Sequence, residues 1–329
     1  MKNGIVTFGI LGAGKIAEKF AEACVHPMCK NICKVTAVAS QTAGKSHTFA
    51  NKFGISKAYD SYASLLEDKD IDCVYVANTP NFHYDTVMAS IKAGKAVLCE
   101  KPFVTTEAEA RSLFDAAKKA NVLVMEAMWS RYLPTVMLAK KYIEDGRIGT
   151  PIHVDSSFCI YRPFSPTARL FHPDLQGGAI NDLGVYNVSV TSYILGEYPD
   201  SLKAYASFAP TGVDTHTTVA FHYPSGTTAN VACSICFEAE QAHTIYGTKG
   251  TIRLDGKFNG YENVTLNENV NGKTVTTHKG SDTTNGFEYE VAEFVSLYNK
   301  GALESPLQSA YDSITVCALL EKIAKSSRE

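Results

Sequence analysis

The sequence predicts an α/β fold, with a doubly wound parallel sheet in its first part and an α+β domain with a large, mostly antiparallel open sheet in its second. Residues 5–125 alternate short apolar runs with amphipathic segments, which is the pattern of parallel strands joined by crossover helices. Beyond about residue 150, strand-like runs are separated by turns, as in antiparallel sheets. With 329 residues, we expect one domain over 1–125 and another over 126–329. Whether the C-terminal helix packs back on the first domain is left open.

The elements of the first part follow from its apolar runs. Each expected strand is a short apolar segment, and each expected helix has apolar residues at helical spacing. Gly94 closes one helix, a typical C-terminal stop. We expect strands at residues 6–11, 35–39, 73–77, 96–99 and 122–125, and helices at 15–24, 43–53, 82–93 and 107–120.

The second part combines one long helix signal, at residues 181–195, with strands over 202–254. We expect a strand at residues 215–221, and a Pro-Ser-Gly turn separates it from the next strand. The pair Asn271-Gly272 between β-rich runs predicts a hairpin. Helices are expected again at residues 288–299 and 309–324.

Composition and charge exclude several classes of protein. The formal net charge is −3, and no long run of Lys or Arg is present to form the basic stripe that nucleic acid requires. The first apolar stretch is broken by Gly9, Gly12 and Gly14, so it is neither a signal sequence nor a membrane span. No later segment approaches the ~18 unbroken apolar residues of a span. We therefore expect a cytoplasmic protein that binds neither nucleic acid nor membranes.

The chain has nine cysteines, which in a reducing compartment act mostly as small hydrophobes. One group is close enough in sequence to gather a metal: Cys24, His26, Cys29 and Cys33. A structural zinc site usually has a second close pair of ligands far along the chain. The only other close pair, Cys233 and Cys236, falls in an expected strand and points to opposite faces. We expect no metal site.

A glycine motif directly after the first expected strand predicts dinucleotide binding by a Rossmann domain. Residues 12–17 read Gly-Ala-Gly-Lys-Ile-Ala, which fits G-x-G-x-x-A, and they open a helix. Gly12 permits the tight turn, Gly14 lets a pyrophosphate approach the backbone, and Ala17 lets the helix pack on the strand. The helix N-terminus faces the anion. We expect the cofactor to contact Gly12, Gly14, Lys15 and Ile16.

The end of the second expected strand indicates whether the cofactor's ribose carries a 2′-hydroxyl, as in NAD, or a 2′-phosphate, as in NADP. An NAD enzyme usually carries Asp or Glu there, which binds the 2′-hydroxyl. This chain has Ser40-Gln41-Thr42, with Lys45 close behind. These groups can bind and neutralise a 2′-phosphate; alternatively they cap the next helix, and both can hold together. We expect NADP, with NAD as the alternative, and a site that includes Ser40, Gln41 and Lys45.

Other polar segments are candidates for the same site. Two follow expected strands, at the sheet edge where α/β proteins bind ligands, although lysine can be a surface charge and proline can simply end a strand. They are Glu100-Lys101-Pro102 and Thr79-Pro80-Asn81-Phe82-His83. Asp182 and Tyr186 stand four residues apart at the start of a helix, hence on one face, after a glycine-containing loop. The alternative for this pair is a helix cap and a core tyrosine.

Taken in order, these segments resemble the Gfo/Idh/MocA oxidoreductase superfamily. Residues 125–186 are especially similar to the branch of dimeric dihydrodiol dehydrogenase, glucose–fructose oxidoreductase and xylose dehydrogenases. Residues 247–252 and 304–307 also look like that branch, so the resemblance covers essentially the whole chain. The motifs that carry it are Gly12–Ala17, Glu100-Lys101-Pro102, Met125–Arg131, Gly177-Gly178-Ala179, Asp182 and Tyr186.

The resemblance implies roles for individual residues. Lys101 matches the lysine that touches the nicotinamide ribose and the reacting oxygen, and Tyr186 matches the proposed acid/base. Asp182 matches an aspartate near the substrate, and Trp129 and Arg131 match an aromatic–basic pair beside the pocket. From the residues themselves, a substrate's hydroxyls can also be bound by Arg162 and Arg169, for which a surface salt bridge is the alternative. The cofactor site would include Thr79, Pro80, Asn81, His83, Glu100, Lys101, Trp129 and Arg131. Two residues depart from the relatives: Asn181 and Gln41.

The implied reaction is hydride transfer between nicotinamide C4 and a carbinol carbon of a sugar, polyol or vicinal diol. Two alternatives remain: a non-catalytic NAD(P)-binding regulator, against which Lys101 and Tyr186 argue, and a glycosidase that uses bound NAD. We also expect a homodimer or higher oligomer. The second sheet lacks enough helices to cover both faces, and an apolar outer face would have to be hidden. Relatives associate through this sheet.

Overall fold

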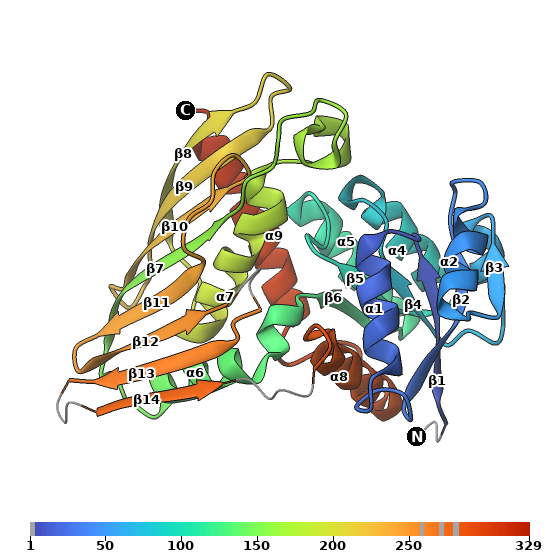
Figure 1. Cartoon of the computed structure of the whole chain (residues 1–329), viewed down its shortest axis with the longest axis horizontal. Coiled ribbons are helices and arrows are strands. Elements are labelled where there is room, and N and C mark those ends of the chain that lie inside the picture. Colours follow the sequence, from blue (N-terminus) through green and yellow to red (C-terminus); the bar gives the residue numbers. More distant parts are fainter. Residues whose placement is uncertain (1–3, 257–259, 270–272, 279–282) are drawn as a thin grey trace. The chain divides into compact units, whose positions relative to one another are not determined.

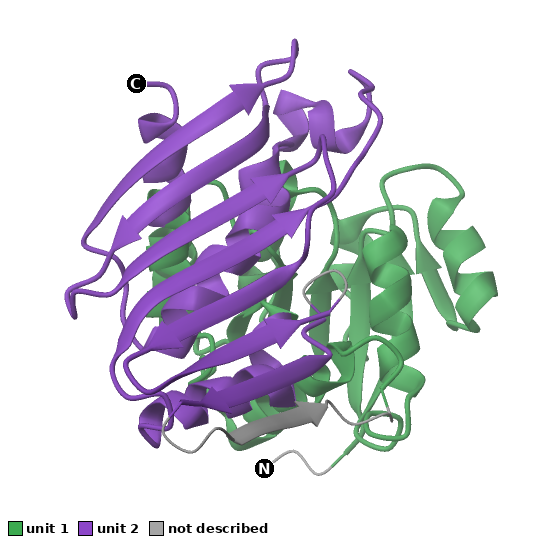
Figure 2. Cartoon of the chain, turned by 60° about the vertical axis from the view of Figure 1, so that its left-hand side comes forward, with its two compact units in different colours: residues 1–129, 282–317 green, residues 130–281, 318–329 purple. Residues whose placement is uncertain are grey.

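The computed structural model describes residues 4–256, 260–269, 273–278 and 283–329. The chain forms two compact units (Figure 2), unit 1 with residues 1–129 and 282–317 and unit 2 with 130–281 and 318–329. The expected turn at Asn271-Gly272 lies outside the described residues. Among those residues, no helix is both long and apolar enough to cross a membrane.

Unit 1 contains the expected doubly wound sheet of six parallel strands, in the order β3-β2-β1-β4-β5-β6. The strand order reverses between β1 and β4, so the carboxyl ends of these two strands form the topological switch point where such sheets bind ligands. Only β3, three half-buried residues, was not expected. The strands are β1 (Val6–Leu11), β2 (Cys33–Ala39), β3 (Lys57–Tyr59), β4 (Cys73–Val76), β5 (Ala96–Glu100) and β6 (Val124–Ala127).

Helices cover both faces of this sheet because its strands are apolar on both sides (Figure 1). On one face the Phe8 ring packs against Phe20 of α1 and Phe294 of α8. On the other, Leu11 belongs to a core that includes Val87 of α4 and Leu113 of α5. The helices are α1 (Lys15–Val25), α2 (Lys45–Phe53), α3 (Tyr62–Leu66), α4 (His83–Lys92), α5 (Glu107–Ala120) and α8 (Phe287–Lys300), and α9 (Ala310–Ser326) continues into unit 2.

Unit 2 contains an eight-stranded sheet in the order β14-β13-β12-β11-β7-β10-β9-β8. Only β10 and β7 pair in parallel, which confirms the expected mostly antiparallel sheet. Its helices α6 (Pro134–Glu144) and α7 (Val185–Leu195) pack on one face, α6 on β12 and β13 and α7 on β7. The strands are β7 (Pro151–Cys159), β8 (Ser201–Phe208), β9 (Asp214–His222), β10 (Thr228–Ser234), β11 (Ala242–Gly247), β12 (Gly250–Asp255), β13 (Asn263–Glu268) and β14 (Lys273–His278).

The outer face of the second sheet is polar, and the expectation of an apolar outer face is wrong. Along β9, Val219 and Phe221 are buried, whereas Thr218 and His222, on the opposite face, are exposed. Asp155 on β7 and Asn230 on β10 are likewise polar and exposed. An antiparallel sheet with one polar face can stand in water, so burial of apolar surface does not by itself demand a partner.

Candidate active site

The turn after β1 has the shape that a dinucleotide requires. Gly12 has a φ of +111°, and a Cβ there would lie 2.7 Å from Ala77 C and Asn78 N, so only glycine fits. A Cβ at Gly14 would meet nothing closer than Ala77 O at 4.0 Å. Gly14 caps α1 without any side-chain hydrogen bond to the first amides. The space before Gly14 and these amides fits a pyrophosphate, with Lys15 and Ile16 in the first turn.

The end of β2 carries no carboxylate. Ser40 is buried, and its Oγ accepts a hydrogen bond of 3.1 Å from Thr42 N in the turn before α2. No side chain caps α2, whose N-cap is Gly44, and the O–H of Ser40 remains available as a donor. Gln41 and Lys45 are exposed, and Lys45 is the first residue of α2. These groups fit the ribose of NAD as well as the 2′-phosphorylated ribose of NADP, and none of them would repel a 2′-phosphate.

His83 holds two loops together and has no exposed surface with which to touch a ligand. Its Nδ1 lies 3.0 Å from Pro102 O and 3.1 Å from Phe103 O, and its Nε2 lies 3.1 Å from Asn78 O. The ring is fully buried, and burial lowers its pKa. The structure thus favours a positioning role over the expected direct contact. Before it, Thr79 precedes the short helix Pro80–Phe82, in which Asn81 is half-buried.

A second buried residue, Glu126, supports the same loop from β6. Its Oε1 accepts a hydrogen bond of 3.0 Å from Phe103 N, and its Oε2 accepts bonds of 2.7 Å from Gln308 Nε2 and Ser313 Oγ. His83 and Glu126 together fix the backbone just after Lys101, which is half-buried. The peptide between Lys101 and Pro102 is cis. Sequence reasoning did not find this role of Glu126, because its partners lie about 180 residues further along the chain.

Glu100, the residue before Lys101, is a buried acid. It accepts hydrogen bonds from the Tyr75 hydroxyl and, over 3.3 Å, from Lys101 N. Burial raises the pKa of Glu100 to about 7, although the Tyr75 bond and the Lys101 charge act in the opposite direction. Only 5% of Glu100 is exposed, so it can orient Lys101 but offers a cofactor little surface.

In unit 2, Asp182 and Tyr186 lie on a helix whose first turn is widened. Residues Ile180–Gly184 form a π-helical turn that continues into α7, a distortion often found at functional sites. Arg169 Nη2 donates a hydrogen bond of 2.7 Å to Asp182 Oδ1. The Tyr186 ring is mostly buried and packs against Phe158, with centroids 6.0 Å apart. The structure therefore brings Arg169, Asp182 and Tyr186 onto one short segment.

The remaining expected residues are Arg131, Trp129 and Arg162, which differ in burial and contacts. Arg131 is fully buried, with its Nε 2.8 Å from Ser189 Oγ and its Nη2 2.9 Å from Ser189 O. It contacts the helix that carries Tyr186 and has no surface for a ligand, which corrects its expected place beside a pocket. Trp129, in unit 1, stacks on Phe287 at 5.2 Å and is 6% exposed. Arg162 is exposed and donates to Tyr161 O over 2.8 Å.

Comparison with known proteins decides the family. Residues 6–128 match the model of an oxidoreductase family with an NAD-binding Rossmann fold, and residues 136–253 match the GFO/IDH/MocA C-terminal domain. A trans-1,2-dihydrobenzene-1,2-diol dehydrogenase of Mus musculus is 31% identical over 97% of this chain and 96% of its own length. One from Xenopus laevis is 32% identical over 96% of both. The chain belongs to the Gfo/Idh/MocA family of oxidoreductases.

Solved structures show the fold of this Gfo/Idh/MocA enzyme throughout its length. Levoglucosan dehydrogenase in complex with NADH and levoglucosan superposes with a TM-score of 0.88 at 21% identity, covering 98% of this chain and 97% of that one. A 3-ketoreductase from Actinomadura kijaniata in complex with NADP gives 0.85 at 22% identity, covering 98% of both chains. As a member of the family, the protein is an oxidoreductase that uses a nicotinamide dinucleotide.

Proposed function

We propose that this enzyme transfers a hydride between nicotinamide C4 and a carbinol or carbonyl carbon of a sugar, polyol or vicinal diol. The observation that carries the proposal is the short segment in which Arg169 holds Asp182 four residues before Tyr186. A carboxylate with one oxygen engaged by arginine can accept hydrogen bonds from substrate hydroxyls on its other oxygen. The relatives with similar sequences are named for a diol, and a structural neighbour is named for levoglucosan, which supports the proposed class here.

In this proposal the chain's own residues manage the proton. The bound nicotinamide supplies or accepts the hydride. Tyrosine ordinarily has a pKa near 10, and we propose that the Lys101 ammonium favours the Tyr186 phenolate, so that Tyr186 takes the proton from the substrate hydroxyl. In the reverse direction Lys101 polarises the carbonyl. The buried groups Glu100, His83 and Glu126 keep the Lys101 loop in place.

Three further assignments belong to the proposal. NADP is the preferred cofactor, because Ser40 stands where an acid would repel its 2′-phosphate and Lys45 is exposed next to it. Arg162 binds hydroxyls on the substrate's outer part, whereas Trp129, stacked on Phe287 and 6% exposed, offers the substrate little surface. The enzyme works in the cytoplasm, which agrees with its cysteines: all nine are described as free thiols, and eight of them are buried.

The enzyme is also proposed to be a homodimer. The open outer face of the unit 2 sheet is available for a second copy, as the family resemblance implies. Tyr205 and Tyr246 project from this face with 70% and 40% of their surface exposed, and exposed tyrosines are frequent at interfaces.

A screen of sugars, polyols, inositols and vicinal diols tests the proposed reaction. Absorbance at 340 nm should report reduction of NADP, and more slowly of NAD, with at least one of these compounds. Release of free sugar from glycosides without net cofactor reduction would contradict the proposal and indicate a glycosidase. Binding of the dinucleotide without turnover of any compound would indicate a regulator.

A further inference from the structure

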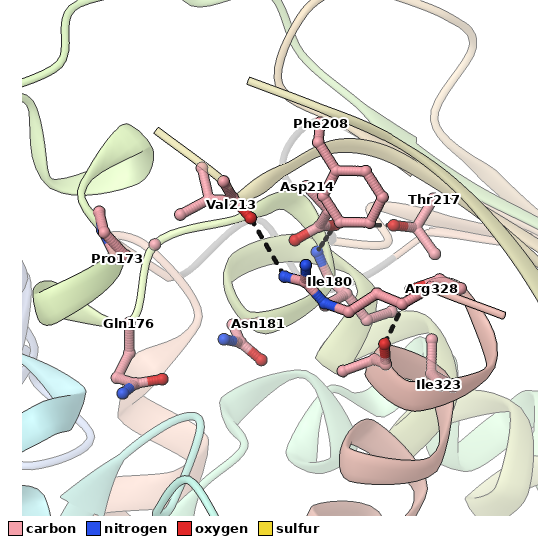
Figure 3. A pocket seen from close by; sticks show the side chains of 14 residues that line it. Pro173, Gln176, Ile180, Asn181, Phe208, Val213, Asp214, Thr217, Ile323 and Arg328 are labelled. Atoms are coloured by element: carbon pink, nitrogen blue, oxygen red, sulfur yellow. Dashed lines mark hydrogen bonds between the residues drawn. The ribbon is translucent and has the colours of Figure 1, made fainter. Parts of the chain in front are cut away.

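Unit 2 contains a cavity of about 200 Å³ that the proposed reaction does not use (Figure 3). It lies between the 173–181 segment, the turn that joins β8 to β9, and the C-terminal end of α9. Neither Asp182 nor Tyr186 lines it, and neither do Arg162 and Arg169. The cavity is therefore distinct from the groups assigned to the substrate.

A buried carboxylate forms one wall of the cavity. Asp214 is 8% exposed, and its Oδ2 accepts hydrogen bonds of 2.9 Å from Ile180 N and 2.7 Å from Thr217 Oγ1. Gly178, with a φ of +113°, leaves room for Asp214, because a Cβ there would collide with Asp214 Oδ1. Burial raises the pKa of Asp214. The Asp214 carboxylate thus provides a hydrogen-bond acceptor in the wall of the cavity.

A guanidinium lies on the same cavity. Arg328 Nη2 donates a hydrogen bond of 3.1 Å to Gly212 O, and its guanidinium lies 4.7 Å from the centroid of the Phe208 ring. Guanidinium has five N–H donors, so Arg328 can donate to a ligand while it keeps its bond to Gly212. Its positive charge also opposes the rise in the pKa of Asp214, so neither charge dominates the cavity.

Two carboxamides complete the polar lining. Figure 3 shows the amide groups of Gln176 and Asn181 on neighbouring positions below the Arg328 guanidinium. Neither side chain forms a hydrogen bond with another described residue, so both retain donors and an acceptor for a ligand. Gln176 has a φ of +54°, a conformation that non-glycine residues rarely adopt. Asn181 is also the residue that departs from the family pattern next to Asp182.

This lining selects the chemistry of a ligand. An anion would approach Asp214 and a cation would approach Arg328, so a charged molecule meets one unfavourable neighbour. A hydroxyl group can both accept from Arg328 and donate to Asp214, and either carboxamide can pair with it in both senses. We propose that this cavity is a second binding site, for a neutral polyhydroxylated small molecule of the size of a monosaccharide or smaller. The inference does not depend on the proposed reaction and would stand if Tyr186 were purely structural.

Calorimetric titration of the full chain, without cofactor, tests the site. The probes are glycerol, D-xylose and D-glucose, each added to the unmodified protein and to Asn181→Leu, Arg328→Met and Asp182→Asn. At least one probe should bind the unmodified protein and Asp182→Asn alike. The dissociation constant should rise about 3- to 10-fold in Asn181→Leu and in Arg328→Met, since each loses about one hydrogen bond's worth of free energy.

A matched control and the contrary results complete the design. Lys325→Met removes a charge from the same end of α9 without touching the cavity, and it should bind as the unmodified protein does. Melting curves identify any variant that fails to fold, in which case the other cavity variant decides. Absence of binding by all three probes, or binding that survives both cavity variants and is lost in Asp182→Asn, would overturn the second site. The 340 nm screen fails or succeeds independently of these titrations.

Discussion

Arg169 Nη2 lies 2.7 Å from Asp182 Oδ1, and this ion pair joins the loop before Gly177 to the first turn of the helix that carries Tyr186. The loop is close-packed at this point, because a Cβ at Gly177 would lie 2.6 Å from Arg169 O and Leu170 O. The side chains of Arg169 and Asp182 are 39% and 18% exposed. The pair therefore orients Asp182 while leaving it reachable by a ligand.

Arg169→Met should reduce kcat/KM about 10-fold, chiefly through KM, because Asp182 loses a charge-assisted hydrogen bond of about 1.5 kcal/mol that fixes its direction. The free energy of unfolding should change by less than about 1 kcal/mol, since the pair is partly exposed. Arg111→Met is the matched control: it removes another arginine–carboxylate pair, with Glu107, and should leave the kinetics unchanged. Equal kinetics in the two variants would mean that the Arg169 pair does not position Asp182.

Ser40→Asp should shift the ratio of kcat/KM for NADP to that for NAD at least 10-fold towards NAD. A carboxylate at this position would repel a 2′-phosphate and accept hydrogen bonds from the ribose hydroxyls. Ser40→Ala separates the effect of the added charge from that of the lost hydroxyl, and it should change the ratio much less. An unmodified enzyme that uses NAD as well as or better than NADP would show that the cofactor assignment is wrong.

Glu290→Gln should remove a loss of stability that the unmodified protein undergoes as the pH rises. Glu290 is fully buried, neither of its carboxylate oxygens has a hydrogen-bond partner among the described residues, and burial raises its pKa well above the ordinary value. A carboxyl whose pKa is raised on folding contributes stability that is present below about pH 4.5, its unfolded value, and is lost as the pH rises towards the folded value. Glu100 acts in the same sense between about pH 4.5 and pH 7.

Urea unfolding at pH 5 and pH 8 measures this effect. Relative to the unmodified protein, Glu290→Gln should gain free energy of unfolding between pH 5 and pH 8, because the variant lacks the buried carboxyl that becomes costly as the pH rises. Glu293→Gln, a half-buried position on the same helix, serves as the control and should show no such relative gain. If Glu290→Gln shows no relative gain either, the buried carboxyl is paired in solution and the prediction fails.

Light scattering at micromolar concentration should report a dimer. Tyr205→Glu should weaken it, because a charge on the outer face would have to be desolvated at the interface, whereas Val25→Glu, equally exposed but in unit 1, should not. A monomeric unmodified protein would refute the proposed association.

The parts of the fold that sequence could predict are those in which the signal is local. The turn at Gly12 is an example, since its positive φ and the strand before it are encoded within a few residues. The short β3 and α3 were not expected, because three half-buried residues and a single helical turn carry no periodicity. The π-helical turn at Ile180–Gly184 was not expected either, since it continues into a helix that is buried on nearly all sides and whose sequence does not mark where its first turn widens.

The site shows the same division between local and distant information. Lys101, Asp182 and Tyr186 were candidates from short motifs, but the burial of Arg131 against Ser189 depends on a contact 58 residues away. Only the structure shows that Glu126 holds the loop after Lys101. The polar outer face was misjudged because side chains alternate between the two faces of a strand. Which of the two sets faces outward is fixed only when strand pairing sets the register.

The most direct test of the account is the turnover of Tyr186→Phe on the substrate that the screen identifies, measured at 340 nm beside Lys101→Met and the double variant. The ring should still pack against Phe158, so the fold and dinucleotide binding, followed by fluorescence quenching, should be retained. We predict a kcat lowered roughly 10²- to 10⁴-fold in Tyr186→Phe, a loss at least as large in Lys101→Met, and a double variant little worse than the poorer single one, since in the proposed mechanism the two residues act together. Near-normal turnover of Tyr186→Phe would contradict the account, since the tyrosine would then be structural and the proton would have to pass through Lys101, Asp182 or water.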